Sequence, residues 1–392
     1  MTNLKSSLKL IYNRPLSTEA DEPTVEHNLW LNRPEQGHGL HYAVQYHGTL
    51  KPELTNYYLN KYSEKGSIVL DPFCGSGVVP LQASLLGRIA WASDINQLAV
   101  RITQAKLKPA GLDEVVLFLT QLNLQRPISL SGFQEFFAPF YHPDTYRELV
   151  NLKNAINRYQ AEGVQNRICN FVELLVFSRL HGHAPSHFST YSSPQVALSP
   201  SKQLLLNKKR RQTPEYKAIS PRLIQRTAQL LKDGISSEFL TYTKAAMVKR
   251  ADAQNLTWVN SNSVDLVLTS LPLPDNFDYI SNYWLENWFS GFSDKFINIS
   301  LPDWVRLIRN LLSEMLRVLK PSAYAVLELS VELSGKHNVK TLEELVIQEA
   351  KALSINKKRF CLKEVVAHKP ISATKYEEQK NNQQKLIIFQ VS

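Results

Sequence analysis

A glycine-rich loop between a predicted strand and a predicted helix limits this chain to few fold classes. The apolar run SIVLDP (67–72) is followed at once by FCGSG (73–77) and by the helical segment VVPLQASLLG (78–87). A second predicted strand, RIAWASD (88–94), leads into another helical segment, INQLAVRITQAKL (95–107). This β-α-β-α order predicts a parallel sheet with helices on its faces.

The loop and the acid that ends the second strand indicate the kind of ligand. Glycines let backbone N–H groups approach a ligand closely beside the positive end of a helix. Asp94 ends the second strand, where a carboxylate can accept hydrogen bonds from two ribose hydroxyls. No lysine of a triphosphate-binding loop follows Gly77, which argues against a nucleoside triphosphate. Together these residues predict a ligand that contains a ribose.

The alternation of strands and helices is interrupted once and then resumes. Residues 110–244 contain helical patterns separated by stretches rich in Ser, Pro and His, and we interpret them as a mainly helical, basic insertion. Strand and helix patterns return after it. We therefore expect an N-terminal extension (1–37), an α/β domain in two pieces (38–109 and 245–392), and an insertion that recognises the substrate.

The positive charge of the chain is concentrated in one segment. Residues 201–250 hold twelve Lys and Arg but three acidic residues, so this segment carries nearly all of the net charge of +10. A concentrated basic block favours a polyanion partner, because neutralising phosphates releases counterions; a solvated basic face is the alternative. Within the block we expect phosphate contacts from Lys208, Lys209, Arg210 and Arg211.

Composition excludes several other classes. The three cysteines lie far apart with no CxxC pair, which argues against a zinc site and a disulfide framework. No apolar run reaches the roughly 18 residues of a membrane span. The N-terminus lacks the continuous apolar stretch of a signal peptide, so we expect a cytoplasmic protein without a membrane partner.

The loop and the following acid resemble a known family. DPFCGSG, with SDINQLAV after the next strand, resembles the S-adenosylmethionine site of DNA methyltransferases that methylate cytosine N4 or adenine N6. The resemblance covers residues 40–107 and 245–330. It implies an α/β fold with a Rossmann-like class I methyltransferase sheet, helices on both faces, and S-adenosyl-L-methionine as cofactor. RNA guanosine-N2 methyltransferases carry a close variant of the loop.

The resemblance assigns cofactor roles to the glycine loop. Asp71 matches the acid expected near the methionine amino group of the cofactor. Phe73, Gly75 and Gly77 match the residues that form the wall and floor of the cofactor site.

Further cofactor contacts are implied beyond the loop. Asp94 matches the ribose ligand, with Ile95 beside it. Asp252 is similar to the acid that meets the adenine amine, with Ala253 beside it; an ordinary turn or cap aspartate is the alternative for Asp252. HYAVQYHGTLKPEL (41–54) resembles the family's N-terminal element, which packs beside the methionine moiety, or else is a surface loop and helix start.

The segment TSLPLPD (269–275) follows a predicted buried strand, where the family has its catalytic turn. The lone pair of a cytosine amine is delocalised into the ring, so acceptors aimed at its N–H protons help the nitrogen to attack. The base must also leave the duplex to be reached. The family places Ser, Asn or Asp first, then Pro-Pro, then an aromatic residue. The aligned catalytic residues here are Ser270, Leu271, Pro272 and Leu273.

Two leucines depart from the family pattern. Leu271 keeps a carbonyl acceptor but loses the fixed φ of proline. Leu273 replaces the aromatic residue that stacks on the base, an interaction of about 1–3 kcal/mol. Four nearby aromatic residues are candidates to replace it: Phe277, Tyr279, Tyr283 and Trp284.

Three histidines in the insertion require a separate interpretation. LHGHAPSHFS (180–189) contains His181, His183 and His187 with no acidic or thiol partner nearby in sequence. We therefore expect them to line a polar loop near the base or the phosphates, and we expect no metal.

The sequence thus predicts a site-specific DNA methyltransferase of the restriction–modification or defence type. Ser270 resembles the cytosine-N4 branch, and the expected partners are double-stranded DNA with a flipped target base and a cognate nuclease. A catalytically inert homologue that binds cofactor and DNA is the first alternative. An RNA guanosine-N2 methyltransferase is the second, although those enzymes usually carry Asn or Asp where Ser270 lies.

Overall fold

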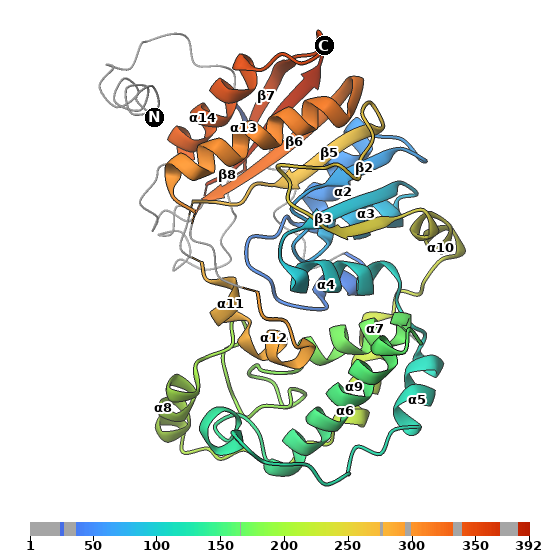
Figure 1. Cartoon of the computed structure of the whole chain (residues 1–392), viewed down its shortest axis with the longest axis vertical. Coiled ribbons are helices and arrows are strands. Elements are labelled where there is room, and N and C mark those ends of the chain that lie inside the picture. The colour runs from blue at the N-terminus through green and yellow to red at the C-terminus, as the bar shows by residue number, and fades with distance from the viewer. Residues whose placement is uncertain are drawn as a thin grey trace.

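An eight-stranded sheet forms the centre of the α/β part of the chain (Figure 1). The computed structural model describes residues 24–26, 37–164, 166–274, 277–294, 299–331, 339–368 and 383–392. The order of strands across the sheet is β1 (Thr24–Glu26), β7 (Phe360–His368), β8 (Gln383–Val391), β6 (Leu319–Val331), β5 (Val264–Ser270), β2 (Ile68–Asp71), β3 (Ile89–Asp94) and β4 (Met247–Arg250).

Among these strands, β8 alone runs antiparallel to its neighbours, β6 and β7. From β7 to β4 the order is that of a Rossmann-like class I methyltransferase sheet, which confirms the predicted fold class. The chain leaves β2 toward β3 on one side and β5 toward β6 on the other, so the strand order reverses between β2 and β5. Ligands of open α/β sheets bind at such a point, beyond the carboxyl ends of the strands.

Helices cover both faces of the sheet because the central strands are apolar on both sides. In β5, Val267 packs on one face against α13 (Leu301–Val318) and α14 (Val339–Ala352). Its neighbours Leu266 and Leu268 pack on the other face against α2 (Pro52–Tyr62) and α3 (Val78–Leu85). Side chains alternate along a strand, so a continuous apolar run indicates burial on both faces.

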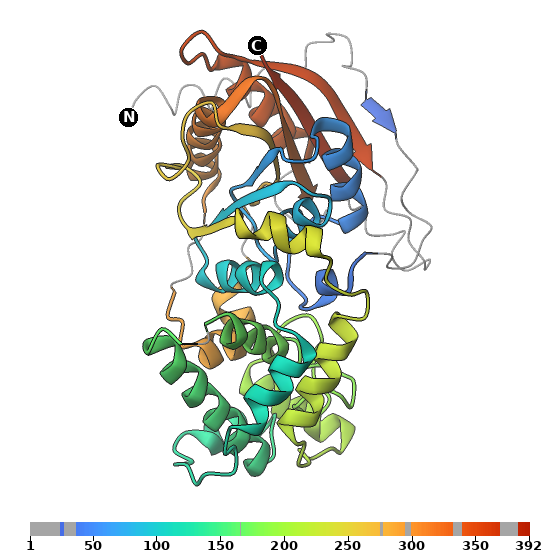
Figure 2. The ribbon, with the colours of Figure 1, turned by 90° about the vertical axis from the view of Figure 1, so that its right-hand side faces the viewer.

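Residues 112–230 form a helical layer beyond the carboxyl ends of β2 and β3 (Figure 2). Its helices are α5 (Leu112–Thr120), α6 (Pro143–Ala161), α7 (Asn166–Phe177), α8 (Pro200–Arg210) and α9 (Ile219–Leu230), with a π-helical turn at Phe133–Phe137. The next helix, α10 (Ser237–Lys244), instead packs beside the sheet on α3 and β3 (Figure 1). The layer shares one apolar core with α4 (Gln97–Leu107) and α12 (Trp284–Ser290). The division of the chain into an α/β domain and an insertion at 110–244 stays a prediction.

One sequence prediction falls mostly outside this description. The N-terminal extension (1–37) lies outside the described residues except for 24–26 and 37. Among the described helices, none has the length and apolar character that a bilayer span requires.

Candidate functional site

Four side chains meet at the carboxyl edge of the sheet. Asp71 ends β2, Asp94 ends β3 and Ser270 ends β5, while Glu328 lies opposite Ser270 on β6. Thr269 donates its hydroxyl to Asp71 Oδ1 over 2.6 Å, and Ser270 donates its hydroxyl to Glu328 Oε2. Asp71 and Ser270 thus lie on adjacent strands at one edge of the sheet, close to each other as the sequence analysis expects.

The glycine loop folds over Asp94. The amide of Gly75 donates to Asp94 Oδ2 over 3.0 Å, and the amide of Asn96 donates to Oδ1 over 2.9 Å. Gly77 has a φ of +77°, and a Cβ at this position would lie 2.7 Å from Thr103 Oγ1. Glycine is therefore needed at position 77 both for its backbone angle and for close packing of the loop on α4.

The carboxylates of Asp71 and Asp94 have no cationic partner among the described residues. Burial raises the pKa of Asp71 to about 7, against the hydrogen bonds from Thr269 and the Phe73 amide, which lower it. Burial also raises the pKa of Asp94 to about 6, against its backbone amide donors. Within the described part of the chain, neither forms an ion pair with Lys, Arg or His. Such a site favours a ligand that brings its own positive charge.

A tyrosine that the sequence analysis did not single out covers the loop. A Cβ at Gly75 would lie 3.3 Å from the Tyr46 ring, and Asn96 Nδ2 donates to the Tyr46 hydroxyl over 3.0 Å. The Tyr46 ring stacks on Tyr283 with a centroid distance of 5.2 Å. The segment resembling the N-terminal element of the family is therefore in contact with the glycine loop; the loosely matching stretch HYAVQY was its one signal in the sequence.

The remaining residues with predicted cofactor roles are Ile95, Asp252 and Ala253. Asp252 follows β4 and accepts from the Gln254 amide over 2.9 Å, as a turn aspartate does. Its neighbour Ala253 is buried in the core under the sheet, and Ile95 is 52% exposed at the sheet edge. Their cofactor roles stay predictions.

The catalytic turn is tied to the sheet and to α13. The Leu271 amide donates to the Glu328 carbonyl over 2.9 Å, and Trp304 Nε1 donates to the Pro272 carbonyl over 2.6 Å. Leu271 is 3% exposed within the core that α13 covers, and Leu273 is partly buried against the same core. Both leucines of the altered turn therefore contribute to packing.

The aromatic residues after the turn divide into two groups. One group gathers against the segment that carries Tyr46: Phe277, Tyr279 and Tyr283. Phe277 stacks on His47 at a centroid distance of 4.0 Å. Trp284 instead donates its indole N–H to the Leu198 carbonyl over 2.9 Å and packs in the core of the insertion. The first three remain candidates to contact a base, whereas Trp284 packs in that core.

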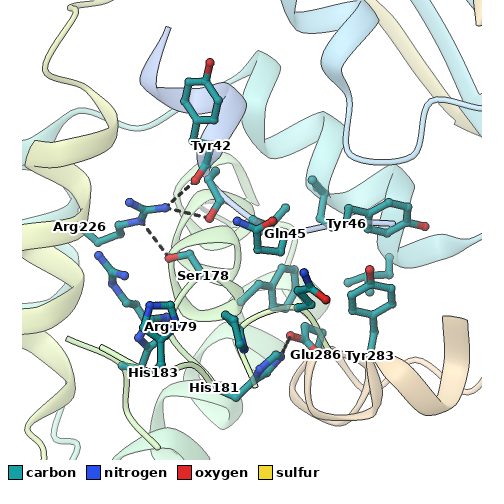
Figure 3. A pocket seen from close by; sticks show the side chains of 18 residues that line it. Tyr42, Gln45, Tyr46, Ser178, Arg179, His181, His183, Arg226, Tyr283 and Glu286 are labelled. Carbon is teal, nitrogen blue, oxygen red and sulfur yellow. Dashed lines mark hydrogen bonds and ion pairs between the residues drawn. The ribbon is translucent and has the colours of Figure 1, made fainter. Parts of the chain in front are cut away.

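A cavity of about 210 Å³ lies between the Tyr46 segment, α4, α12 and the end of α7 (Figure 3). The three histidines of the insertion, His181, His183 and His187, all line it. His181 is hydrogen-bonded through Nδ1 to the Ser193 carbonyl (2.7 Å) and through Nε2 to Glu286 Oε1 (3.1 Å). No group of His, Cys, Asp or Glu side chains suited to a metal ion is found in the described ranges.

The predicted phosphate-binding segment lies at the end of α8. Lys208, Lys209, Arg210 and Arg211 are all exposed, and none forms an ion pair within the described residues. The Arg210 guanidinium lies 3.7 Å from the ring centroid of Tyr191. Their role in nucleic-acid binding stays a prediction.

Comparison with known proteins supports the family resemblance for the N-terminal part of the chain. Residues 5–105 match the sequence model of a family described as DNA methylase. A segment of 106 residues is 30% identical to type II methyltransferase M.MjaII of Methanocaldococcus jannaschii, covering 26% of this chain and 19% of that protein. A segment of 120 residues is 33% identical to a ribosomal protein L11 methyltransferase of Caldanaerobacter subterraneus, covering 28% and 38%. The matches thus span about a fifth and about two fifths of these relatives.

The solved structures that match this chain share little sequence with it. TrmN from Thermus thermophilus is 13% identical with a TM-score of 0.35, covering 88% of this chain and 50% of that one. An rRNA-methylase described as putative from Clostridium thermocellum is 12% identical with a TM-score of 0.36, covering 88% and 100%. The predicted resemblance to amino-methylating DNA methyltransferases is confirmed by the family match, and S-adenosyl-L-methionine is the cofactor that goes with it.

Proposed function

We propose that this protein is a DNA methyltransferase that transfers a methyl group from S-adenosyl-L-methionine to an exocyclic base amine, with cytosine N4 as the favoured acceptor. The observation that carries the proposal is the hydrogen bond from Ser270 to Glu328. Ser270 ends β5, and the neighbouring strand β2 ends at Asp71. A serine hydroxyl has one proton. Because the Ser270 hydroxyl donates this proton in a hydrogen bond to the Glu328 carboxylate, the serine oxygen is left to accept a hydrogen bond from an amine N–H.

The glycine-loop residues fit the cofactor by charge and by shape. The cofactor carries an ammonium and a sulfonium group. Asp71, which is buried, and Asp94, which is partly buried, offer carboxylates that have no cationic partner in the described part of the chain, as such a ligand requires. When bound, the cofactor supplies the methyl group. Asp94 would accept from the ribose hydroxyls, while Asp71 would lie near the methionine ammonium.

The turn after β5 would orient the base amine. Ser270 accepts one N–H of the amine, and the Leu271 carbonyl is the second acceptor that the family pattern implies. The hydrogen bond from Trp304 to Pro272 fixes the turn, so its acceptors are positioned before a substrate arrives. Glu328 draws the Ser270 proton away from the amine and so keeps the serine oxygen in the acceptor role.

The insertion would hold the nucleic acid. The four exposed cations at the end of α8 are suited to backbone phosphates, which position a protein on DNA but do not identify a sequence. The adjoining groove also presents apolar side chains, among them Phe136 and Leu204, which are 44% and 47% exposed. A surface of this kind suits contact with DNA from which a base has been flipped out. Double-stranded DNA as substrate, and a cognate nuclease as partner, are parts of this proposal.

The test is to express the protein in a methylation-free host and detect modified bases across the genome by single-molecule sequencing. We expect N4-methylcytosine in one short sequence context, and at least about a hundredfold less of it with Ser270→Ala, as for the loss of a hydrogen-bonding group at a reacting centre. Adenine methylation would change the acceptor base. Equal methylation by Ser270→Ala and the native protein would remove the proposed role of the serine.

A catalytically inert homologue is the second candidate, and Leu273 favours it, because this side chain packs against the α13 core where the family has a ring that stacks on the base. This protein would bind the cofactor and DNA but would leave no methylated base in the same experiment. Cofactor binding measured by calorimetry separates this outcome from a protein that has lost the cofactor site altogether.

A further inference from the structure

The cavity between the insertion and the α/β domain is separate from the proposed methyl-transfer site. In Figure 3, Arg179 and Arg226 lie on one side of it and Tyr46 and Tyr283 on the other. The residues that line it include neither Asp71 nor Asp94, and none of the catalytic turn (270–273). Tyr46, whose ring also covers Gly75, forms the wall toward the glycine loop.

The two arginines of this cavity have no carboxylate partner in the described part of the chain. Arg226 donates to the carbonyls of Tyr42 (2.7 Å) and Ala43 (3.1 Å). Arg179 is 7% exposed; its Nη2 donates to Gln229 Oε1 over 2.9 Å, while its buried Nε has no hydrogen-bond partner. Burial of a charge without a counter-charge is costly, so these guanidinium groups favour an anion.

The charges around the arginines reinforce this preference. Burial, together with the charge of Arg179, lowers the pKa of Arg226 to about 10. Fully buried Lys106 is a third basic group near Arg226, and burial, with repulsion from Arg226, lowers the pKa of Lys106 to about 7. The acid that lines the cavity, Glu286, is hydrogen-bonded to His181. Burial lowers the pKa of His187 to about 4, so this histidine is neutral near pH 7.

We propose that this cavity binds a phosphate group through Arg179 and Arg226. Planar guanidinium groups match the oxygens of phosphate in two-pronged hydrogen bonds, and the buried Nε of Arg179 is a donor that still lacks an acceptor. The volume of about 210 Å³ is below the roughly 300–1,000 Å³ of sites for drug-sized ligands. The cavity therefore fits a phosphate or a small part of a nucleotide.

Two sources can supply this phosphate. One is a free phosphate ester, and the other is the backbone of a nucleic-acid strand drawn into the cavity. The second source rests on the proposed function, whereas phosphate binding itself does not depend on methyl transfer. An inert protein would bind phosphate as well as an active one.

The experiment compares the full-length native protein with Arg179→Gln and with the matched control Arg126→Gln, which removes an exposed arginine from the same insertion. Affinities are measured by calorimetry for inorganic phosphate, for 2′-deoxycytidine 5′-monophosphate and for a short single-stranded DNA. Independently, the thermal midpoint of the native protein is measured with increasing phosphate at constant ionic strength. We expect phosphate to raise the midpoint. We expect Arg179→Gln to weaken phosphate-ester binding at least about tenfold, or about 1.4 kcal/mol, with no change for the control.

The pattern across ligands identifies the source. Loss of binding for phosphate and the mononucleotide indicates a site for a free phosphate ester, and loss for the oligonucleotide alone indicates a backbone phosphate. Equal behaviour of Arg179→Gln and Arg126→Gln with all three ligands overturns the proposal. So does a weakened affinity of Arg179→Gln for S-adenosyl-L-methionine without any change toward phosphates, because the guanidinium would then hold the cofactor's carboxylate. The midpoint titration needs no variant; no rise with phosphate, together with unchanged oligonucleotide binding by Arg179→Gln, also overturns the site.

Discussion

The unpaired carboxylates of the glycine loop make cofactor affinity depend on pH. Binding of a cationic ligand requires Asp71 and Asp94 in their ionised forms, and their pKa values are about 7 and about 6. Between pH 7.5 and pH 5 the ionised fraction falls about eightyfold for Asp71 and about tenfold for Asp94. The affinity for S-adenosyl-L-methionine should therefore fall by several hundredfold, or about 4 kcal/mol.

The assay is calorimetric titration of the cofactor at pH 5, 6, 7 and 7.5 at constant ionic strength. Asp71→Asn is the matched variant, since it keeps the size of the side chain but removes its titration. We expect this variant to bind more weakly at pH 7.5 and to retain only the roughly tenfold pH dependence that Asp94 contributes. Dissociation constants of the native protein that agree within about threefold at pH 5 and pH 7.5 would refute the reasoning, because the carboxylates would then not face the ligand.

Stability without the cofactor should change in the opposite direction. The pKa of Asp71 is raised above the ordinary value of 3.8, so the folded protein holds this proton more tightly than the unfolded chain does. The resulting stability is fully present below pH 3.8 and is lost as the pH rises through 7. The thermal midpoint of the native protein should accordingly fall relative to that of Asp71→Asn as the pH rises from 5 to 8. Addition of the cofactor should reduce this difference.

Two further predictions concern the DNA surface and the catalytic turn. Replacing all four cations at 208–211 with Gln should reduce the magnitude of the slope of log K against log salt by up to about 3.6, and an unchanged slope would place the segment outside the DNA interface; Arg126→Gln is the control. Trp304→Phe leaves the Pro272 carbonyl without its indole donor, so the free energy of unfolding in a denaturant titration should fall by about 1–3 kcal/mol. The same variant should lower methylation more than cofactor affinity, and an equal loss of both would mean that Trp304 supports the whole edge of the sheet rather than the turn.

The strands and the glycine loop could be predicted because their signals are local. The centres of these strands, 68–70 and 266–268, are apolar without interruption, as strands buried on both faces are, and glycine residues mark the turn between strand and helix. Asp71 and Asp94 follow directly from this pattern, since each acid ends a recognisable strand. The residues that position the catalytic turn depend on contacts between segments far apart in the chain, and no short motif identifies them.

Glu328 had a sequence signal that could have been used. It is the one acidic residue in the otherwise apolar strand AYAVLELS, and it is 1% exposed. An acid inside such a strand requires a partner, which in the fold is Ser270. Arg179 and Arg226 had no comparable signal, because they lie among many other basic residues and become neighbours only when α7 and α9 pack together.

The two leucines of the turn have different consequences for function. The side chain at position 271 lies in the α13 core, while the group expected to meet the base amine is the backbone carbonyl. Leucine therefore satisfies the packing requirement there, and the hydrogen bond from Trp304 to the next carbonyl supplies rigidity that a proline would otherwise give. At position 273 the lost group is the aromatic ring itself. The nearest replacement is the cluster of Phe277 and Tyr279, which packs against His47 after the turn. Activity of this turn thus depends on whether a ring from that cluster reaches the base, and not on the loss of proline.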